Sequence, residues 1–134
     1  MDTPLFLRVT DPRRLAMTVG DGLWLRILDL PATVAGRSWA ADGALTLDVR
    51  DDLVSSVAGG WRLTVQGGRG VAERTLAPAD VTLGVAELSS LYLGGVRATD
   101  LARAGRLSAP DPASITLLDA MHATARRPWC PAVF

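Results

Sequence analysis

The chain has 134 residues and a formal net charge of zero, with 14 arginines, no lysine and 14 acidic residues. A chain of this length forms one ordinary domain, and its 49% hydrophobic content and mean hydropathy of +0.23 exclude an intrinsically disordered chain. The balanced charge argues against nucleic acid or an anionic membrane as a partner, because both bind an excess of basic residues. No apolar run is long enough to cross a bilayer, no signal peptide is visible at Met1, and the single Cys130 allows no internal disulfide. We therefore expect a cytoplasmic protein.

The sequence divides into a lead-in, residues 1–12, and a folded domain, residues 13–134. The lead-in carries an apolar triplet at residues 5–7 and ends at the break Asp11-Pro12. The triplet forms either a short edge strand or part of a linker to an upstream domain.

Five segments alternate apolar and polar residues with the period of a β-strand. They are residues 22–29, 44–50, 61–66, 69–75 and 81–85. Gly67-Gly68 joins two of them into a predicted β-hairpin. In the strand at 61–66, alternation predicts that Trp61, Leu63 and Val65 face the helices.

The spacing of apolar residues becomes helical in other parts of the chain. Predicted helices cover residues 30–39, 86–93, a stretch capped at 99–100 that ends at Gly105, and 112–125. Asp29 and Asp111 provide N-caps, with a proline in the first turn of each helix. In the last helix, Ile115, Leu118 and Met121 are expected to face the sheet. The predicted fold class is α+β, with about five mostly antiparallel strands and helices packed on one face.

The residue types and their spacing argue against a metal site, a catalytic triad, a Schiff base and a phosphate-binding loop. The chain has one histidine, His122, and one cysteine, Cys130, eight residues apart, so we expect no metal site. A Ser-His-Asp triad would have to use His122, but its place on an apolar helical stripe favours a core or interface role. The absence of lysine excludes a Schiff base and a P-loop lysine. The glycine-rich residues 66–70 lie between two predicted strands, which favours a hairpin over a phosphate-binding loop. The carboxylate pair Asp51-Asp52 is interpreted as a solvated turn.

Four tryptophans are many for a domain of this size, and they are Trp24, Trp39, Trp61 and Trp129. Large core residues and residues that line a cavity or an interface are equally good interpretations, because tryptophan is enriched in both places.

A series of segments runs in a distinctive order along the chain. The segments are residues 11–15, 21–31, 45–51 with the strand at Trp61, 77–81, Leu-Ser-Ser-Leu-Tyr-Leu-Gly-Gly at 88–95, Pro128-Trp129-Cys130, and the terminal Phe134. In this order they resemble the C-terminal domain of the Eis (enhanced intracellular survival) family of actinobacterial N-acetyltransferases. The similarity extends from about Leu5 to the end, and residues 88–95 and Phe134 are its most specific parts.

The resemblance implies a sterol-carrier-protein-like fold that follows a GNAT domain and a GNAT-like domain in a longer enzyme. Such enzymes transfer acetyl from acetyl-CoA to amines, aminoglycosides included, and assemble as hexamers, so it also implies a homo-oligomer. It further implies that the C-terminal carboxylate of Phe134 is the general base, paired with a tyrosine acid from the first domain. Val133, Phe134 and Trp129 would form part of the substrate pocket.

The sequence departs from the family in two features, the acetyl-CoA signature and the residue before Phe134. The acetyl-CoA signature of GNAT folds (Arg or Gln, two residues, Gly, one residue, Gly or Ala) occurs nowhere in it. We therefore expect no cofactor in this chain, acetyl-CoA bound by GNAT domains of the same parent protein, and no activity for the chain alone. Val133 stands where an acidic residue would help to bind a cationic substrate.

Two other functions agree with the sequence. One is a stand-alone carrier of a lipid or another apolar ligand, which needs an apolar tunnel between sheet and helices. The other is an interaction module in which residues 5–7, Trp129 and Phe134 form an interface.

Overall fold

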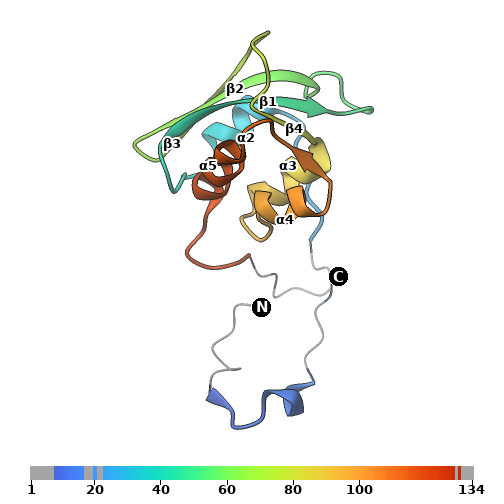
Figure 1. The fold of residues 1–134 in the computed structure, drawn as a ribbon, viewed down its shortest axis with the longest axis vertical. Coiled ribbons are helices and arrows are strands. Elements are labelled where there is room, and N and C mark those ends of the chain that lie inside the picture. The colour runs from blue at the N-terminus through green and yellow to red at the C-terminus, as the bar shows by residue number, and fades with distance from the viewer. Residues whose placement is uncertain (1–7, 17–19, 21–22, 129, 131–134) are drawn as a thin grey trace.

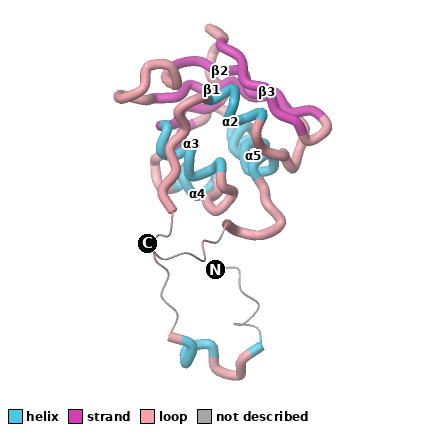
Figure 2. The backbone as a smooth tube through the Cα atoms, turned by 180° about the vertical axis from the view of Figure 1, so that it is seen from behind, coloured by secondary structure: helices cyan, strands magenta, loops and turns pink. Residues whose placement is uncertain are grey.

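The computed structural model describes residues 8–16, 20, 23–128 and 130 (Figure 1). A five-stranded sheet forms one layer of the structure, and the four helices that follow residue 29 gather on one of its faces (Figures 1 and 2). This arrangement confirms the predicted α+β class. The apolar triplet at residues 5–7 lies outside the described residues.

The sheet has the strand order β3-β2-β1-β4-β5. Its strands are β1 (Gly43–Arg50), β2 (Gly59–Gln66), β3 (Arg69–Arg74), β4 (Val81–Gly84) and β5 (Leu107–Ser108). Three neighbouring pairs are antiparallel, and β1 pairs with β4 in parallel. The sheet is therefore mixed but mostly antiparallel, as predicted, and β1 lies at its centre.

The predicted faces of β2 are confirmed. Trp61, Leu63 and Val65 are buried, whereas the residues that alternate with them are exposed. Leu63 lies opposite Leu45 of β1, and both belong to the core. The turn between β2 and β3 consists of Gly67 and Gly68, whose φ angles of +58° and +75° suit a two-residue hairpin turn.

Four α-helices and one 3-10 helix are described. The α-helices are α2 (Leu30–Ala35), α3 (Val85–Tyr92), α4 (Ala98–Arg103) and α5 (Pro112–His122), and the 3-10 helix η1 covers Pro12–Leu15. The side chain of Asp29 accepts a hydrogen bond from Ala32 N, and that of Asp111 accepts one from Ala113 N. Both predicted N-caps are therefore confirmed.

The strand predicted at residues 22–29 is wrong, since residues 23–29 pair with no strand. The main-chain N–H of Ile27 donates instead to Ser89 Oγ of α3, at 3.1 Å, and Ile27 is buried. A helix side chain therefore satisfies a group that a neighbouring strand would otherwise bind. The fifth strand is β5, which has only two residues and was not predicted.

Several helix boundaries also differ from the prediction, and α3 covers residues 85–92 rather than 86–93. The helix α2 ends at Ala35 rather than at residue 39, and the Trp39 indole donates to Val34 O at 3.0 Å, which satisfies a carbonyl at the helix end. The helix α5 ends at His122 rather than at residue 125, because Ala123 has an extended backbone with ψ 143°.

The start of α4 differs for a tertiary reason. Thr99 and Asp100 were predicted to cap it, but the helix begins at Ala98, and its first N–H groups donate to Asp119 of α5. A carboxylate from another helix therefore provides the cap.

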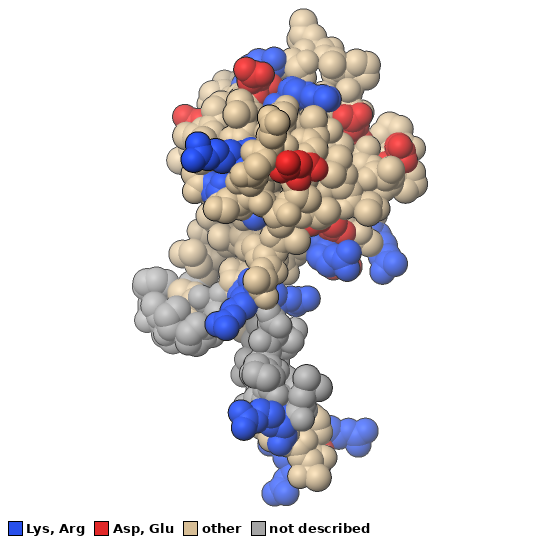
Figure 3. Space-filling view, turned by 90° about the vertical axis from the view of Figure 1, so that its left-hand side faces the viewer, with Lys and Arg blue, Asp and Glu red and all other residues tan. Residues whose placement is uncertain are grey.

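No helix in the described part of the chain is long and apolar enough to cross a membrane. On the face seen in Figure 3, acidic and basic side chains are interspersed over the body formed by the sheet and helices. This face thus has the mixed charge that the balanced composition predicts.

Candidate functional site

The three predicted site residues, Trp129, Val133 and Phe134, lie outside the described residues. The chain that leads to them leaves the fold at the end of α5. We define residues 123–128 as the exit segment. The candidate site lies where this segment begins, among α3, α5 and the loop after α2.

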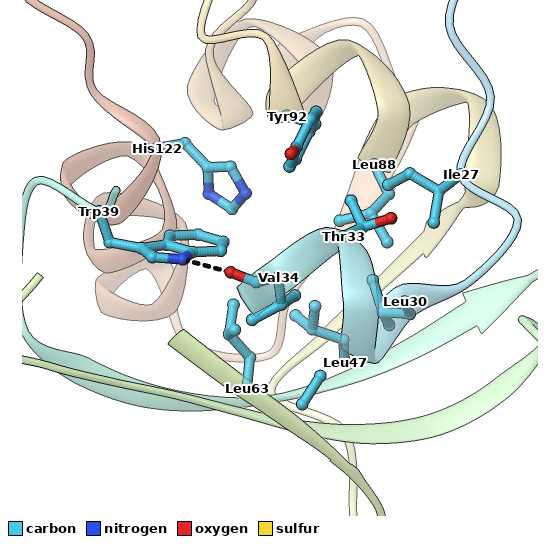
Figure 4. Close-up of a pocket in the computed structure, with 11 residues that line it drawn as sticks. Ile27, Leu30, Thr33, Val34, Trp39, Leu47, Leu63, Leu88, Tyr92 and His122 are labelled. Atoms are coloured by element: carbon cyan, nitrogen blue, oxygen red, sulfur yellow. Dashed lines mark hydrogen bonds between the residues drawn. The ribbon is translucent and has the colours of Figure 1, made fainter. Parts of the chain in front are cut away.

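His122, the last residue of α5, is buried and neighbours aromatic side chains (Figure 4). Its ring packs edge-on against Trp39, with centroids 4.8 Å apart and planes at 76°. The Nδ1 atom lies 3.0 Å from the carbonyl oxygen of Leu118. Because a carbonyl oxygen only accepts, Nδ1 carries the proton in this contact.

Burial lowers the pKa of His122 to about 4, mainly because a charged imidazolium would be desolvated. The positive charge of Arg37 lowers the pKa further, while the Leu118 carbonyl and Asp119 oppose the shift. The imidazole is therefore neutral at pH 7. Its Nδ1 binds a main-chain carbonyl, whereas a catalytic triad needs a carboxylate there. His122 is a core residue, as its place on the apolar stripe predicted.

Arg37 connects the ends of two helices. Its guanidinium donates to the carbonyl oxygens of Tyr92, the last residue of α3, and of His122. It also lies 4.7 Å from the ring centroid of Trp39 and 5.5 Å from that of Tyr92. Partial negative charge gathers at helix C-termini, so one cation stabilises both ends. The sequence offered no sign of this contact, because its partners are 55 and 85 residues away.

A cleft of about 620 Å³ lies beside the exit segment. It is lined by Gly94, Gly95, Val96, Arg97, Thr99, Thr116, Asp119, Ala120, His122, Ala123, Thr124, Ala125 and Arg127. Asp119 is the carboxylate in this lining, but its oxygens accept hydrogen bonds from α4 and from Arg97 at 3.1 Å. Its role is therefore to hold α4 on α5.

The second cavity is apolar and lies between the sheet and the helices (Figure 4). Its volume is only about 10 Å³, enough for roughly one water molecule. Its walls include Leu47 and Leu63 from the sheet and Val34 from α2. A lipid or sterol needs a pocket of roughly 300 Å³ or more, so the described core has no room for one.

The interpretation of Asp51-Asp52 as a solvated turn is wrong for Asp51, whose side chain is buried. Its Oδ1 accepts hydrogen bonds from Leu53 N and Val54 N and forms an ion pair with Arg26. Desolvation alone would raise the pKa of this carboxyl, but these contacts outweigh it and hold the pKa below its ordinary value. Asp51 therefore closes the loop after β1 and ties it to the segment before α2.

The tryptophans divide between the two interpretations. Trp39 and Trp61 belong to the core, and Trp39 also lines the apolar cavity. Trp24 is 85% exposed and is an interface candidate.

Known proteins resemble this chain in sequence and in fold. Residues 30–131 match the sterol carrier protein domain. An uncharacterised N-acetyltransferase of Streptomyces griseus is 42% identical over 135 residues, which span 99% of this chain and 32% of that protein. The N-acetyltransferase Eis of Mycobacterium tuberculosis is 37% identical over 126 residues, or 90% of this chain and 30% of that protein.

The crystal structure of Eis1 from Mycobacterium abscessus superposes with a TM-score of 0.84 and 35% identity. The match covers all of this chain and 34% of Eis1. The chain thus spans about a third of the length of the relatives that it matches.

Proposed function

Because the chain belongs to the sterol carrier protein domain family, in the form that it shares with Eis-type N-acetyltransferases, we propose that it works as one domain of an acetyl-CoA-dependent N-acetyltransferase that acts on amines. The observation that carries the proposal is the alignment of nearly the whole chain with about a third of such enzymes. The acetyl-CoA loop of GNAT folds is absent from the sequence. Other domains of the parent protein would therefore bind acetyl-CoA, and this chain alone would be inactive.

In this proposal the domain supplies the α-carboxylate of Phe134 as the general base. A free α-carboxylate has a pKa of about 3.3–3.7 and is a weak base in water. Apolar neighbours such as Trp129, Val133 and the Phe134 ring would desolvate it and raise its pKa toward a useful range. Pro128 and Pro131 restrict the backbone before it and reduce the entropy lost on placing the last residue.

The proton transfer prepares the nucleophile. A substrate ammonium gives a proton to the carboxylate, directly or through one water, and the neutral amine attacks the thioester carbonyl of acetyl-CoA. The carbon–sulfur bond breaks, and the thiolate takes a proton from an acid in another domain. The amide nitrogen loses its second proton, which restores that acid. The products are an acetylated amine and free CoA.

The test uses the full-length parent enzyme with one glycine added after Phe134. The added residue moves the carboxylate by up to about 3.5 Å and leaves every side chain in place. We expect kcat to fall by roughly 10²-fold or more, with little change in KM for acetyl-CoA. The control is Phe134→Leu, which keeps the carboxylate at its chain position and should lose much less. Unchanged turnover in the extended enzyme would remove the terminal carboxylate from the mechanism.

The carrier alternative has no comparable support. A stand-alone lipid carrier needs an internal site, and the apolar cavity in the described core measures about 10 Å³.

A further inference from the structure

Gly94 and Gly95, which directly follow the helix predicted at residues 86–93, also form a contact surface. The exit segment lies against these two glycines, because a β-carbon placed on Gly94 would lie 2.8 Å from the hydroxyl oxygen of Thr124 and closer still to its methyl carbon. A β-carbon on Gly95 would lie 3.0 Å from Cγ of Pro128. Non-bonded carbon atoms rarely approach so closely, so each glycine makes room for one end of the exit segment. We call Gly94 and Gly95 the glycine seat.

Two hydrogen bonds link the seat to its surroundings. Gly94 N donates to Leu91 O at 2.8 Å and closes the end of α3, with Gly94 at φ +75°. Thr124 Oγ1 donates to Gly94 O at 3.4 Å, so the exit segment touches the seat by a polar contact as well as by packing.

Arg37 fixes the position of the seat relative to the end of α5. Its guanidinium binds the carbonyl of Tyr92, two residues before the seat, and the carbonyl of His122, one residue before the exit segment. Both ends of the contact are therefore attached to one half-buried cation. The direction in which the chain leaves α5 is set by this arrangement rather than by the helix itself, which ends at His122.

We propose that Gly94 and Gly95 are positioning residues for the C-terminal carboxylate, since they determine the path of the exit segment. This inference rests on the proposed function. Six residues follow Pro128, and a chain of that length reaches at most about 20 Å. A shift of the chain at Thr124 or Pro128 therefore changes where the carboxylate can lie. Misplacement of a catalytic group by about 1 Å can lower a rate by roughly 10²-fold.

The test compares Gly94→Ala with Gly105→Ala in the full-length enzyme. The two glycines have nearly equal φ angles, +75° and +71°, so alanine strains the backbone equally at both. They differ in that a β-carbon at Gly105 meets no atom within 4 Å. We expect Gly94→Ala to lower kcat at least about tenfold with KM for acetyl-CoA nearly unchanged, and Gly105→Ala to lose less than about twofold.

Two further variants keep the test decisive if Gly94→Ala folds poorly. A β-carbon on Gly94 would lie nearest to the methyl, hydroxyl and Cβ atoms of Thr124, and Thr124→Ala removes the first two and keeps Cβ at 3.1 Å. The double variant Gly94→Ala, Thr124→Ala should therefore recover most of the lost kcat. Gly95→Ala requires Pro128 to move by only a few tenths of an ångström, so its loss should be smaller than that of Gly94→Ala.

A second readout follows the exit segment without catalysis. Cys130 lies two residues after Pro128, and its alkylation rate in the full-length enzyme can be measured by peptide mass spectrometry. We expect Gly94→Ala to change this rate several-fold and Gly105→Ala to leave it unchanged. An unchanged rate together with equal kcat in Gly94→Ala and Gly105→Ala would overturn the role of the seat.

The two proposals fail in different ways. If the glycine added after Phe134 lowers kcat but Gly94→Ala behaves like Gly105→Ala, the seat has no positioning role and the proposed function stands. If the added glycine leaves kcat unchanged, the carboxylate has no catalytic role, and the general-base role proposed for Phe134 and the role of the seat in catalysis fail together.

Discussion

Acidification should destabilise this domain through His122, the single histidine of the chain. The imidazole is buried beside Trp39 and titrates near pH 4 in the folded domain, against about 6.5 in the unfolded chain. Between these values the unfolded chain binds one more proton, so its free energy falls relative to the folded state as the pH decreases. At about 1.36 kcal/mol per pKa unit, the shift corresponds to a loss of about 3 kcal/mol of folding stability between pH 7 and pH 4.

Urea unfolding of the chain, followed by tryptophan fluorescence at several pH values, measures this loss. The control is His122→Gln, which does not titrate and should lack the loss between pH 6.5 and about 4. Since Arg37 and Asp119 act on the imidazole in opposite directions, Asp119→Asn should move its titration to a still lower pH. The imidazole resonance in an NMR titration reports the pKa directly. A midpoint near 6.5 would refute the argument, because it would mean that the imidazole is solvated in the folded domain.

Two other expectations concern stability. Leu63→Ala and Leu118→Ala should each lower the free energy of unfolding by roughly 2–5 kcal/mol, because both side chains are buried between sheet and helices. The control is Leu76→Ala at a fully exposed position, which should change the free energy of unfolding by less than about 0.5 kcal/mol. Losses below roughly 1 kcal/mol at both core positions would mean that the faces are assigned wrongly. Asp119→Ala removes the cap of α4 and should lower the free energy of unfolding by about 1–2 kcal/mol. The amide protons of residues 98–103 should then exchange faster with solvent. Unchanged exchange there would contradict the capping role.

Much of the fold follows from patterns that are local in the sequence. Alternation with a period of two predicted the buried face of β2, at Trp61, Leu63 and Val65, because successive side chains of a strand point to opposite sides. The Gly67-Gly68 turn and the cap at Asp111 were likewise predictable, since each depends only on neighbouring residues.

The candidate site was predictable only in part. The pair Gly94-Gly95 directly follows the helix predicted at residues 86–93, but its contacts with Thr124 and Pro128 join residues about 30 positions apart. The contribution of Arg37 was not predictable, since a guanidinium that binds two helix ends leaves no periodic pattern. The roles of Trp129, Val133 and Phe134 stay predictions that rest on family resemblance.

The sequence by itself determined the buried face of β2, the position of the hairpin turn and the N-caps at Asp29 and Asp111. These properties depend on backbone geometry within a few residues. Only the tertiary structure decided which groups satisfy one another across the chain. Residues 23–29 alternate like a strand, yet Ile27 binds Ser89 of α3, and α4 is capped from α5 by Asp119. A buried polar group must find a partner, but any donor or acceptor that the fold brings within reach can serve. The pairing of β1 with β4 and the path of the exit segment are contacts between residues far apart in sequence, so only the tertiary structure decided them.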